Sequence, residues 1–245
     1  MDARLPVRAF FTDRHQGVSA APFNELNLAD HVGDDPSAVA VNRTVVGDTA
    51  GAPVVFMKPE HGVRVAVLGS EYLDGREPPV ADVLITDVPG LALATLAADC
   101  VPLLIHDGLS GVVAAVHIGR EGLRRGVVDA AVAALVDMRG GWHFQESLTA
   151  SIGPSICGQC YEVSREIRAT TAAFHPTAMA TTRWGSPSLD LPRAVSGRLV
   201  ELGFRNVMRH RFCTFEEPAL FSYRRDQVTG RQAGIVVCEG RKHER

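Results

Sequence analysis

The sequence predicts a single α+β domain over residues 1–245, in which strands outnumber helices. Short apolar runs recur along the chain between turn residues, and such runs are typical of strands. Stretches with apolar residues at helical spacing are longer but fewer. The 245 residues fit one large domain or two small ones, and we find no repeat, low-complexity segment or linker that would divide them.

The composition is that of a globular protein with a sizeable core, because 46% of the residues are apolar. A formal net charge of −3 argues against general binding of nucleic acids. No apolar stretch approaches the roughly 18–20 residues of a membrane helix, and residues 1–4 do not begin a signal peptide. The five cysteines, an odd number, do not suggest a secreted disulfide framework. We therefore expect a cytoplasmic protein with free thiols, without nucleic acid or membrane as a partner; the oligomeric state stays open.

Strands are expected wherever a short apolar run is bounded by Gly, Pro or polar turn residues. The run 63–67 alternates between apolar and polar residues, which is the period of a strand with one buried face. Residues 69–80 carry glycine, acidic residues and prolines, and are expected to form an exposed loop. In chain order, the expected strands are 7–12, 54–57, 63–67, 82–86, 91–97, 101–106, 111–117, 147–152, 207–212 and 232–238.

Helices are expected where apolar residues recur every three to four positions. The first begins at Asp35, which can cap the helix, and at Pro36, which suits the first helical position; it ends near Gly51. The clearest helix covers 122–138 and ends at Gly140-Gly141. Two further helices are expected over 164–174, before a proline, and over 193–202, before a glycine.

The runs 101–106 and 111–117 are joined by the turn Asp107-Gly108-Leu109-Ser110, which predicts a β-hairpin. Cys100 stands before the first run and His117 closes the second. In an antiparallel hairpin these two residues lie at the same open end. A thiol beside an imidazole suits a zinc ion or an activated thiol.

His61 lies in another glycine-containing turn and completes a set of three metal-ligand residues with Cys100 and His117. A His-Cys-His set leaves one tetrahedral position open, as in catalytic zinc sites, where zinc lowers the pKa of bound water toward about 7. Copper accepts the same ligands and is the alternative metal. Taken singly, Cys100 could equally be a core cysteine and His61 an ordinary turn residue.

Two basic segments are candidates for binding an anion. The turn 119–122 leads into the long helix, so its backbone N–H groups and Arg120 could hold a phosphate. The segment 221–232 places three arginines, Arg224, Arg225 and Arg231, around a glycine turn, which could bind an anion or a purine edge. Each segment could also be solvated, with its arginines paired to nearby carboxylates.

Cys157 and Cys160 form a Cys-x-x-Cys pair in the segment 153–162. A zinc site with four cysteines needs a second such pair, which the sequence does not contain, and Cys213 and Cys238 stand alone. We therefore expect an ordered loop near the active site, with packed thiols.

The order of these motifs resembles the laccase-domain family, also called YfiH-like or multicopper polyphenol oxidase-like, and the resemblance covers nearly the whole chain. The resemblance implies a mixed β-sandwich flanked by helices, in an αββα arrangement. It also implies that His61, Cys100 and His117 are zinc ligands. The motifs that carry it are residues 27–28, 31–36, 42–43, 61–62, 81–87, 98–102, 117–119, 152–154, 160–163, 189–191, 213–214, 222–226 and 229–234.

The family is associated with purine nucleoside phosphorylase and adenosine deaminase activity, so we expect a zinc-dependent enzyme whose substrates are a purine nucleoside and phosphate. In deamination, zinc-bound hydroxide would attack the purine, whereas in phosphorolysis phosphate would attack the sugar. The alternatives are a copper-dependent polyphenol oxidase and a non-catalytic or cell-wall peptide editing protein. His61, Cys100 and His117 are the expected catalytic group, and the candidate substrate contacts are Asn27, Arg43, Arg120, Arg224 and Arg225.

The sequence departs from the family pattern beside two of the expected ligands. Pro59-Glu60 replaces the usual Gln-Val before His61. After His117, the chain reads Ile118-Gly119-Arg120-Glu121-Gly122, where the family has Ala-Gly-Trp-Arg-Gly, so Glu121 stands in the place of an arginine. If Glu121 faces the cavity, it should repel phosphate and weaken phosphorolysis relative to deamination. Glu60, Asp99 and Glu121 all adjoin an expected ligand, and any of them could move protons.

Overall fold

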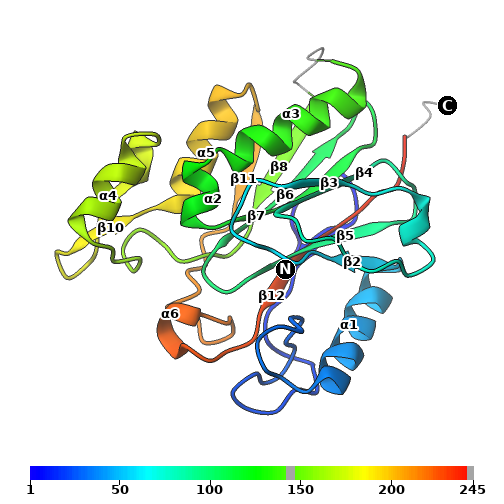
Figure 1. Ribbon diagram of the computed structural model, residues 1–245, viewed down its shortest axis with the longest axis horizontal. Coiled ribbons are helices and arrows are strands. Elements are labelled where there is room, and N and C mark those ends of the chain that lie inside the picture. Colours follow the sequence, from blue (N-terminus) through cyan, green and yellow to red (C-terminus); the bar gives the residue numbers. More distant parts are fainter. Residues whose placement is uncertain (142–146, 242–245) are drawn as a thin grey trace.

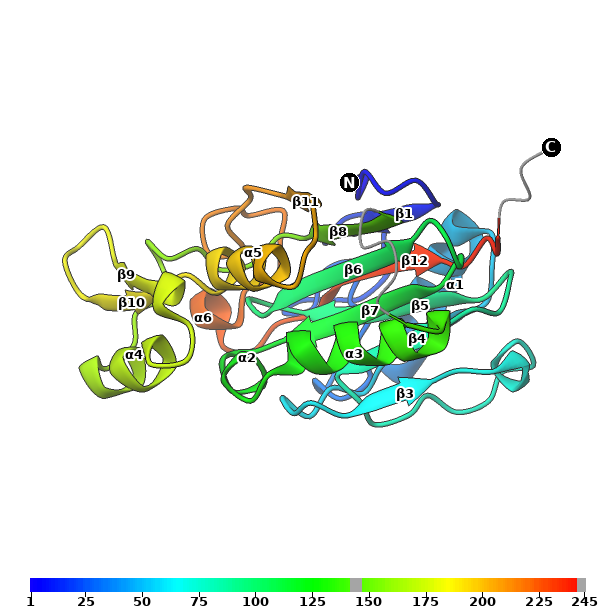
Figure 2. The same ribbon diagram turned by 90° about the horizontal axis from the view of Figure 1, so that it is seen from above.

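Two β-sheets stack in the middle of the molecule (Figures 1 and 2). The computed structural model describes residues 1–141 and 147–241. The first sheet has the order β1-β12-β5-β2, with strands Ala9–Phe11, Gln232–Val237, Ala92–Ala97 and Val54–Phe56. The second has the order β11-β8-β6-β7-β4-β3, with strands Asn206–Arg209, Leu148–Ile152, Val101–Asp107, Val113–Ile118, Val83–Thr86 and Val65–Val67.

Helices cover the outer face of each sheet, which gives four layers (Figure 1). Helix α1, Pro36–Ala50, packs on the four-stranded sheet through Val46 and Ala50. Helices α3, Val127–Arg139, and α5, Leu191–Glu201, pack on the six-stranded sheet. The predicted α+β sandwich flanked by helices is thereby confirmed.

The strands of the inner layers are apolar on both faces because both faces are covered. Along β6, Leu103 and Ile105 belong to the cluster beneath α3 and α5. Leu104, between them in sequence, belongs to the cluster between the two sheets, together with Leu93 of β5 and Val236 of β12. Alternate side chains of one strand thus join different layers, as the two-residue period of a strand requires.

The predicted hairpin is formed by β6 and β7, and Pro102 lies directly opposite His117 in its register. Its turn is fixed by Asp107, whose buried carboxylate accepts hydrogen bonds from the Leu109 N–H at 3.1 Å and the Ser110 hydroxyl at 2.5 Å. Gly111 closes the turn with a φ of 78°, a conformation that favours glycine. Cys100 and His117 therefore lie at the same end of the hairpin, as predicted.

Other elements differ from the sequence prediction. The helix expected over 122–138 is divided into α2, Arg120–Arg124, and α3, because Gly126 adopts a φ of 86° between them. The expected loop 69–80 contains a 3-10 turn, η1, at Ser70–Tyr72. The small hairpin of β9, Met179–Thr181, and β10, Pro187–Leu189, was not predicted from the sequence. It projects together with α4, Arg165–Ala172, at one end of the molecule (Figure 2).

In the described part of the chain, no helix combines the length and apolar character that crossing a membrane requires.

Candidate active site

His61, Cys100 and His117 converge at one end of the β6–β7 hairpin. Their ligand atoms all lie within 4.8 Å of one another, and Cys100 Sγ is 3.7 Å from His61 Nε2. The two imidazole rings meet edge to face, with centroids 4.8 Å apart. The structure thus brings together the three residues that the sequence analysis selected, and we refer to them as the ligand trio.

A single buried carboxylate, Asp82, orients both histidines. Its Oδ1 accepts the His61 backbone N–H at 3.0 Å and pairs with His117 Nδ1 at 2.9 Å. Its Oδ2 accepts the Gly62 N–H at 2.7 Å. Burial opposes a charge on Asp82, yet the hydrogen bonds from His117 and Gly62 hold its carboxyl pKa below the usual range. Because Nδ1 of His117 is engaged, Nε2 is the atom left to face a metal, an arrangement common among metal-binding histidines.

Close packing around the ligand trio requires a glycine at position 119. A Cβ on Gly119 would lie 2.6 Å from His61 Cδ2 and 3.4 Å from Cys100 Sγ. His61 itself has a φ of 59° and Asp99 a φ of 92°, conformations that non-glycine residues seldom adopt. The backbone around the trio therefore adopts energetically unfavourable conformations that fix the positions of these side chains.

The charges within the ligand trio favour a metal-binding form of the cysteine. Burial opposes a charge on Cys100, but the neighbouring His117 lowers the pKa of the thiol to about 6. Burial also opposes a charge on His117, while Cys100 and Asp82 together raise the pKa of its imidazole to about 9. Cys100 is thus stabilised as a thiolate, which is the form that binds metal ions.

A cavity of about 490 Å³ borders the ligand trio. Three arginines, Arg120, Arg224 and Arg231, contribute to its lining. Two tyrosines also line it: the Arg224 guanidinium lies 5.0 Å from the ring centroid of Tyr161, and that of Arg231 lies 5.9 Å from the ring centroid of Tyr223. The cavity combines cationic groups, which suit an anion, with aromatic faces, which suit a flat base.

Of the expected substrate contacts, Arg120 and Arg224 line the cavity, whereas Asn27, Arg43 and Arg225 do not. Asn27 is buried, and its Oδ1 accepts the Arg231 N–H at 2.9 Å. Arg43 donates to the Leu28 carbonyl at 2.9 Å and pairs with Asp30.

Arg225 is engaged with backbone carbonyls, among them those of Thr214 at 2.9 Å and Leu220 at 2.7 Å. Its guanidinium therefore braces the chain around it, and the contacts of Asn27 and Arg43 likewise join neighbouring segments.

Glu121, expected to face the cavity if it were to repel phosphate, is turned elsewhere. Its carboxylate forms ion pairs with Arg120 and with Arg124, the latter at 3.0 Å, and it is not part of the cavity lining. The condition for phosphate repulsion, a Glu121 that faces the cavity, is therefore not met. The reason is local: in the first turn of α2, Glu121 lies within reach of Arg124 three positions along the helix.

The sequence patterns gave no individual role to Asp82, Tyr161 or Tyr223, and they indicated Arg231 only as one of the three arginines of the segment 221–232. Each belongs to a motif that carried the family resemblance. The motifs therefore indicated the family, but not what these individual side chains do. Their convergence depends on distant parts of the chain. Arg231, for example, precedes β12, and the loop with Tyr161 follows β8.

The fold and the ligand trio together are typical of a laccase-domain protein, a β-sandwich with a His-Cys-His group at one end of a hairpin. The family model described as multi-copper polyphenol oxidoreductase laccase matches residues 8–239. The chain belongs to this family, and the resemblance deduced from the sequence motifs is confirmed.

Relatives cover nearly the whole chain. A purine nucleoside phosphorylase of Streptomyces coelicolor is 48% identical over 229 residues, 92% of this chain and 93% of the relative. A purine nucleoside phosphorylase of Corynebacterium glutamicum is 40% identical over 234 residues, 94% of each chain. Among solved structures, Neisseria meningitidis protein NMB0706 is 34% identical and superposes with a TM-score of 0.84 over 96% of this chain and 95% of that chain. Bacillus licheniformis YfiH is 30% identical, with a TM-score of 0.82 over 96% and 93%.

Proposed function

We propose that the protein is a zinc-dependent purine nucleoside phosphorylase. In this reaction, phosphate attacks the anomeric carbon of the nucleoside, the bond from that carbon to the base nitrogen breaks, and the purine base leaves. The observation that carries the proposal is the presence of Arg120, Arg224 and Arg231 in the same cavity as the ligand trio. The names of the relatives support the same activity.

The arginines suit the phosphate. A guanidinium offers paired N–H donors in the geometry of a phosphate oxygen pair and stays charged at neutral pH. Arg231 is held in place by its backbone bond to Asn27, and its Nη1 donates to the Thr229 carbonyl at 2.8 Å. Arg224 is anchored by a bond from Nη1 to the Glu162 carbonyl at 2.8 Å. The remaining N–H groups of both side chains can serve a ligand.

The ligand trio fits zinc by its donor chemistry. Two imidazole nitrogens and one thiolate are ordinary zinc donors, and three protein donors leave one position for substrate or water. Zinc bound there would supply a Lewis acid beside the cavity. Asp82 would keep His61 and His117 oriented, and Cys100 would supply the negative charge that partly neutralises the ion.

Adenosine deamination is the second candidate, because the open position of such a zinc site can hold water. Deamination also needs a group that moves protons. Asp99 is the acidic residue among the described cavity-lining residues, and its oxygens accept bonds from Thr214 at 2.6 Å, Ser222 at 2.7 Å and the Arg224 N–H at 2.6 Å. A carboxylate so fully engaged is a poor proton carrier, so we favour phosphorolysis.

The experiment compares inosine and adenosine turnover with and without phosphate, following free base, sugar phosphate and ammonia. We expect release of base that requires phosphate. In Arg231→Gln, the KM for phosphate should rise about 10-fold or more, since a hydrogen bond to a charged group contributes about 1.5–3 kcal/mol. Arg76→Gln, which removes an exposed arginine paired with Glu71, is the control and should leave the KM unchanged.

Other outcomes identify the alternatives. Ammonia from adenosine without base release would show a deaminase. Oxidation of phenols, together with copper in the purified protein, would show a polyphenol oxidase. Turnover of none of these substrates would overturn the proposed function and favour a non-catalytic or peptide-editing role.

A further inference from the structure

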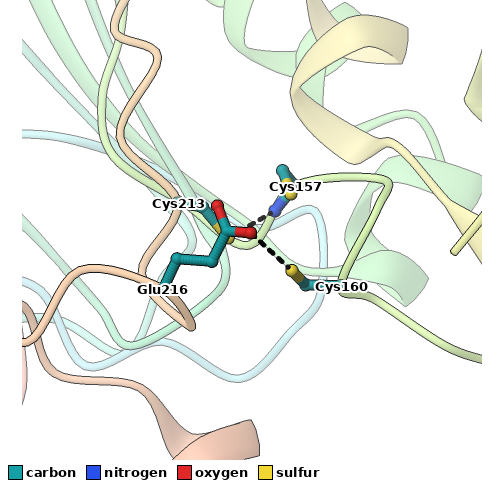
Figure 3. Close-up of side chains that lie close together, drawn as sticks. All are labelled: Cys157, Cys160, Cys213 and Glu216. Carbon is teal, nitrogen blue, oxygen red and sulfur yellow. Dashed lines mark hydrogen bonds between the residues drawn. The ribbon is translucent and has the colours of Figure 1, made fainter. Parts of the chain in front are cut away.

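A second cluster of metal-ligand residues lies outside the ligand trio. Cys157, Cys160, Cys213 and Glu216, here called the cysteine cluster, point toward one another from two loops (Figure 3). One ligand atom from each lies within 4.8 Å of all the others. The expectation that Cys213 stands alone is therefore wrong, because the fold brings it against a pair more than fifty positions away in sequence.

The two loops have the same local geometry. In the first, the Cys157 carbonyl accepts the N–H groups of Cys160 and Tyr161, both at 3.0 Å. In the second, the Cys213 carbonyl accepts those of Glu216 at 3.1 Å and Glu217 at 2.9 Å. The pattern is thus Cys-x-x-Cys facing Cys-x-x-Glu, on two matching turns. Paired turns with this spacing are typical of structural zinc sites, with glutamate here in the place of the fourth cysteine.

The surroundings of the cysteine cluster suit a cation held by negative ligands. The Cys157 N–H donates to Cys213 Sγ at 3.3 Å, a bond that stabilises a thiolate. Arg183 donates to Cys160 Sγ at 2.9 Å and pairs with Glu216, so one positive side chain contacts two of the ligands. In metal sites, such an outer contact orients a ligand and offsets its charge.

We propose that Cys157, Cys160, Cys213 and Glu216 bind a second zinc ion, which is structural. Tetrahedral zinc with Zn–S bonds of about 2.3 Å places its sulfurs about 3.8 Å apart, so the cluster needs to contract by at most about 1 Å to close around the ion. Soft thiolates select zinc over magnesium or calcium. Four protein donors leave no open position, which separates this site in kind from the ligand trio.

The second zinc would link the Cys157–Cys160 and Cys213–Glu216 turns, which support the wall of the cavity. Ile156 and Tyr161, which flank the Cys157–Cys160 turn, both line the cavity. Thr214, next to Cys213, donates its hydroxyl to Asp99. Binding of zinc to the cysteine cluster would therefore stabilise the cavity without contacting a ligand in it. This inference goes beyond the proposed function and does not depend on it.

The test is the zinc content of the protein, measured by mass spectrometry after purification under reducing conditions and dialysis against metal-free buffer. We expect two zinc ions per wild-type chain, one in Cys213→Ser and one in Cys100→Ala. Cys238→Ser is the matched control, since Cys238 is a buried cysteine outside both groups, and should keep both ions. If the ligand trio alone does not bind zinc, the wild type should carry a single ion. Cys213→Ser should then lose this ion, and Cys100→Ala should keep it.

Cobalt substitution gives a second measurement that does not require a variant of the cysteine cluster to fold. The intensity of the thiolate-to-cobalt band rises with the number of thiolate ligands, so Cys100→Ala loaded with cobalt should keep a strong three-thiolate band. Glu216→Gln, at a half-exposed position, should keep the fold and bind zinc more weakly. A single zinc in the wild type that survives Cys213→Ser would overturn the proposal.

Discussion

Asp82 shows how one side chain can decide the geometry of several others. It lies immediately before β4 and binds the His61 backbone and the His117 ring through one oxygen. Neither histidine would otherwise have a fixed position, because His61 lies in a loop and the His117 ring can rotate. The carboxylate therefore fixes two separate residues in the relative positions that binding of one metal ion requires.

Replacing Asp82 should weaken metal binding without removing a ligand. In Asp82→Asn, one of the two acceptor oxygens becomes an NH₂ group, which cannot accept the bonds that Asp82 now receives. We expect zinc affinity at the ligand trio to fall about 10–100-fold, as measured by competition with a chelator. Asp129→Asn is the control, since it changes a surface carboxylate of α3 that pairs with Arg198 of α5. Equal affinities in the two variants would show that Asp82 does not orient the histidines.

Neighbouring residues can have opposite roles, and the sequence alone could not separate them. Arg224 and Arg225 adjoin each other in α6, Tyr223–Asp226, yet Arg224 lines the cavity and Arg225 binds carbonyls behind it. Successive side chains on a helix point about 100° apart, so the direction of each depends on how the helix docks. The sequence indicated that this segment is basic, but not which of the two arginines lines the cavity.

Among the structural elements, the β6–β7 hairpin was the most predictable because its determinants are local. Two apolar runs and a polar turn with glycine specify both the pairing and the end at which Cys100 and His117 meet. The hairpin of β9 and β10 was missed because each strand has three residues, too few to show the period of a strand. The match between the Cys157–Cys160 and Cys213–Glu216 turns was missed because it depends on long-range packing, which periodicity does not report.

The turn between β7 and α2 can be tested through Gly119. Its φ of −83° is open to any residue, so the backbone does not forbid Gly119→Ala. The added methyl group would instead meet the His61 ring. We expect zinc at the ligand trio to be reduced several-fold while the circular dichroism spectrum stays unchanged. Gly47→Ala, in the last turn of α1, adds a Cβ that would lie 3.9 Å from the Ala52 carbonyl oxygen, and should retain zinc and be more stable by about 0.5–1 kcal/mol. Full zinc retention in Gly119→Ala would show that the ring moves aside freely.

At the scale of the whole molecule, the contact between the two sheets should dominate stability. Leu104 of β6 is fully buried between them. We expect Leu104→Ala to lower the free energy of unfolding by about 2–5 kcal/mol, because its neighbours can close only part of the cavity that it leaves. Leu109→Ala, in the turn of the same hairpin and 51% exposed, should change it by less than about 0.5 kcal/mol. Denaturant unfolding of both variants measures the difference, and similar losses would contradict a core between the sheets.

The place of β12 sets the order in which the molecule can be completed during synthesis. This strand, from the last tenth of the sequence, lies between β1 and β5 and pairs with both. The ribosome adds about 5–20 residues per second, so β1 and β5 emerge on the order of ten seconds before the strand that joins them. Until then, the edge of β5 that pairs with β12 lacks its partner and is open to chaperones. Arg231 arrives just before β12, so the nascent chain acquires its complete cavity and its complete four-stranded sheet in the same late step.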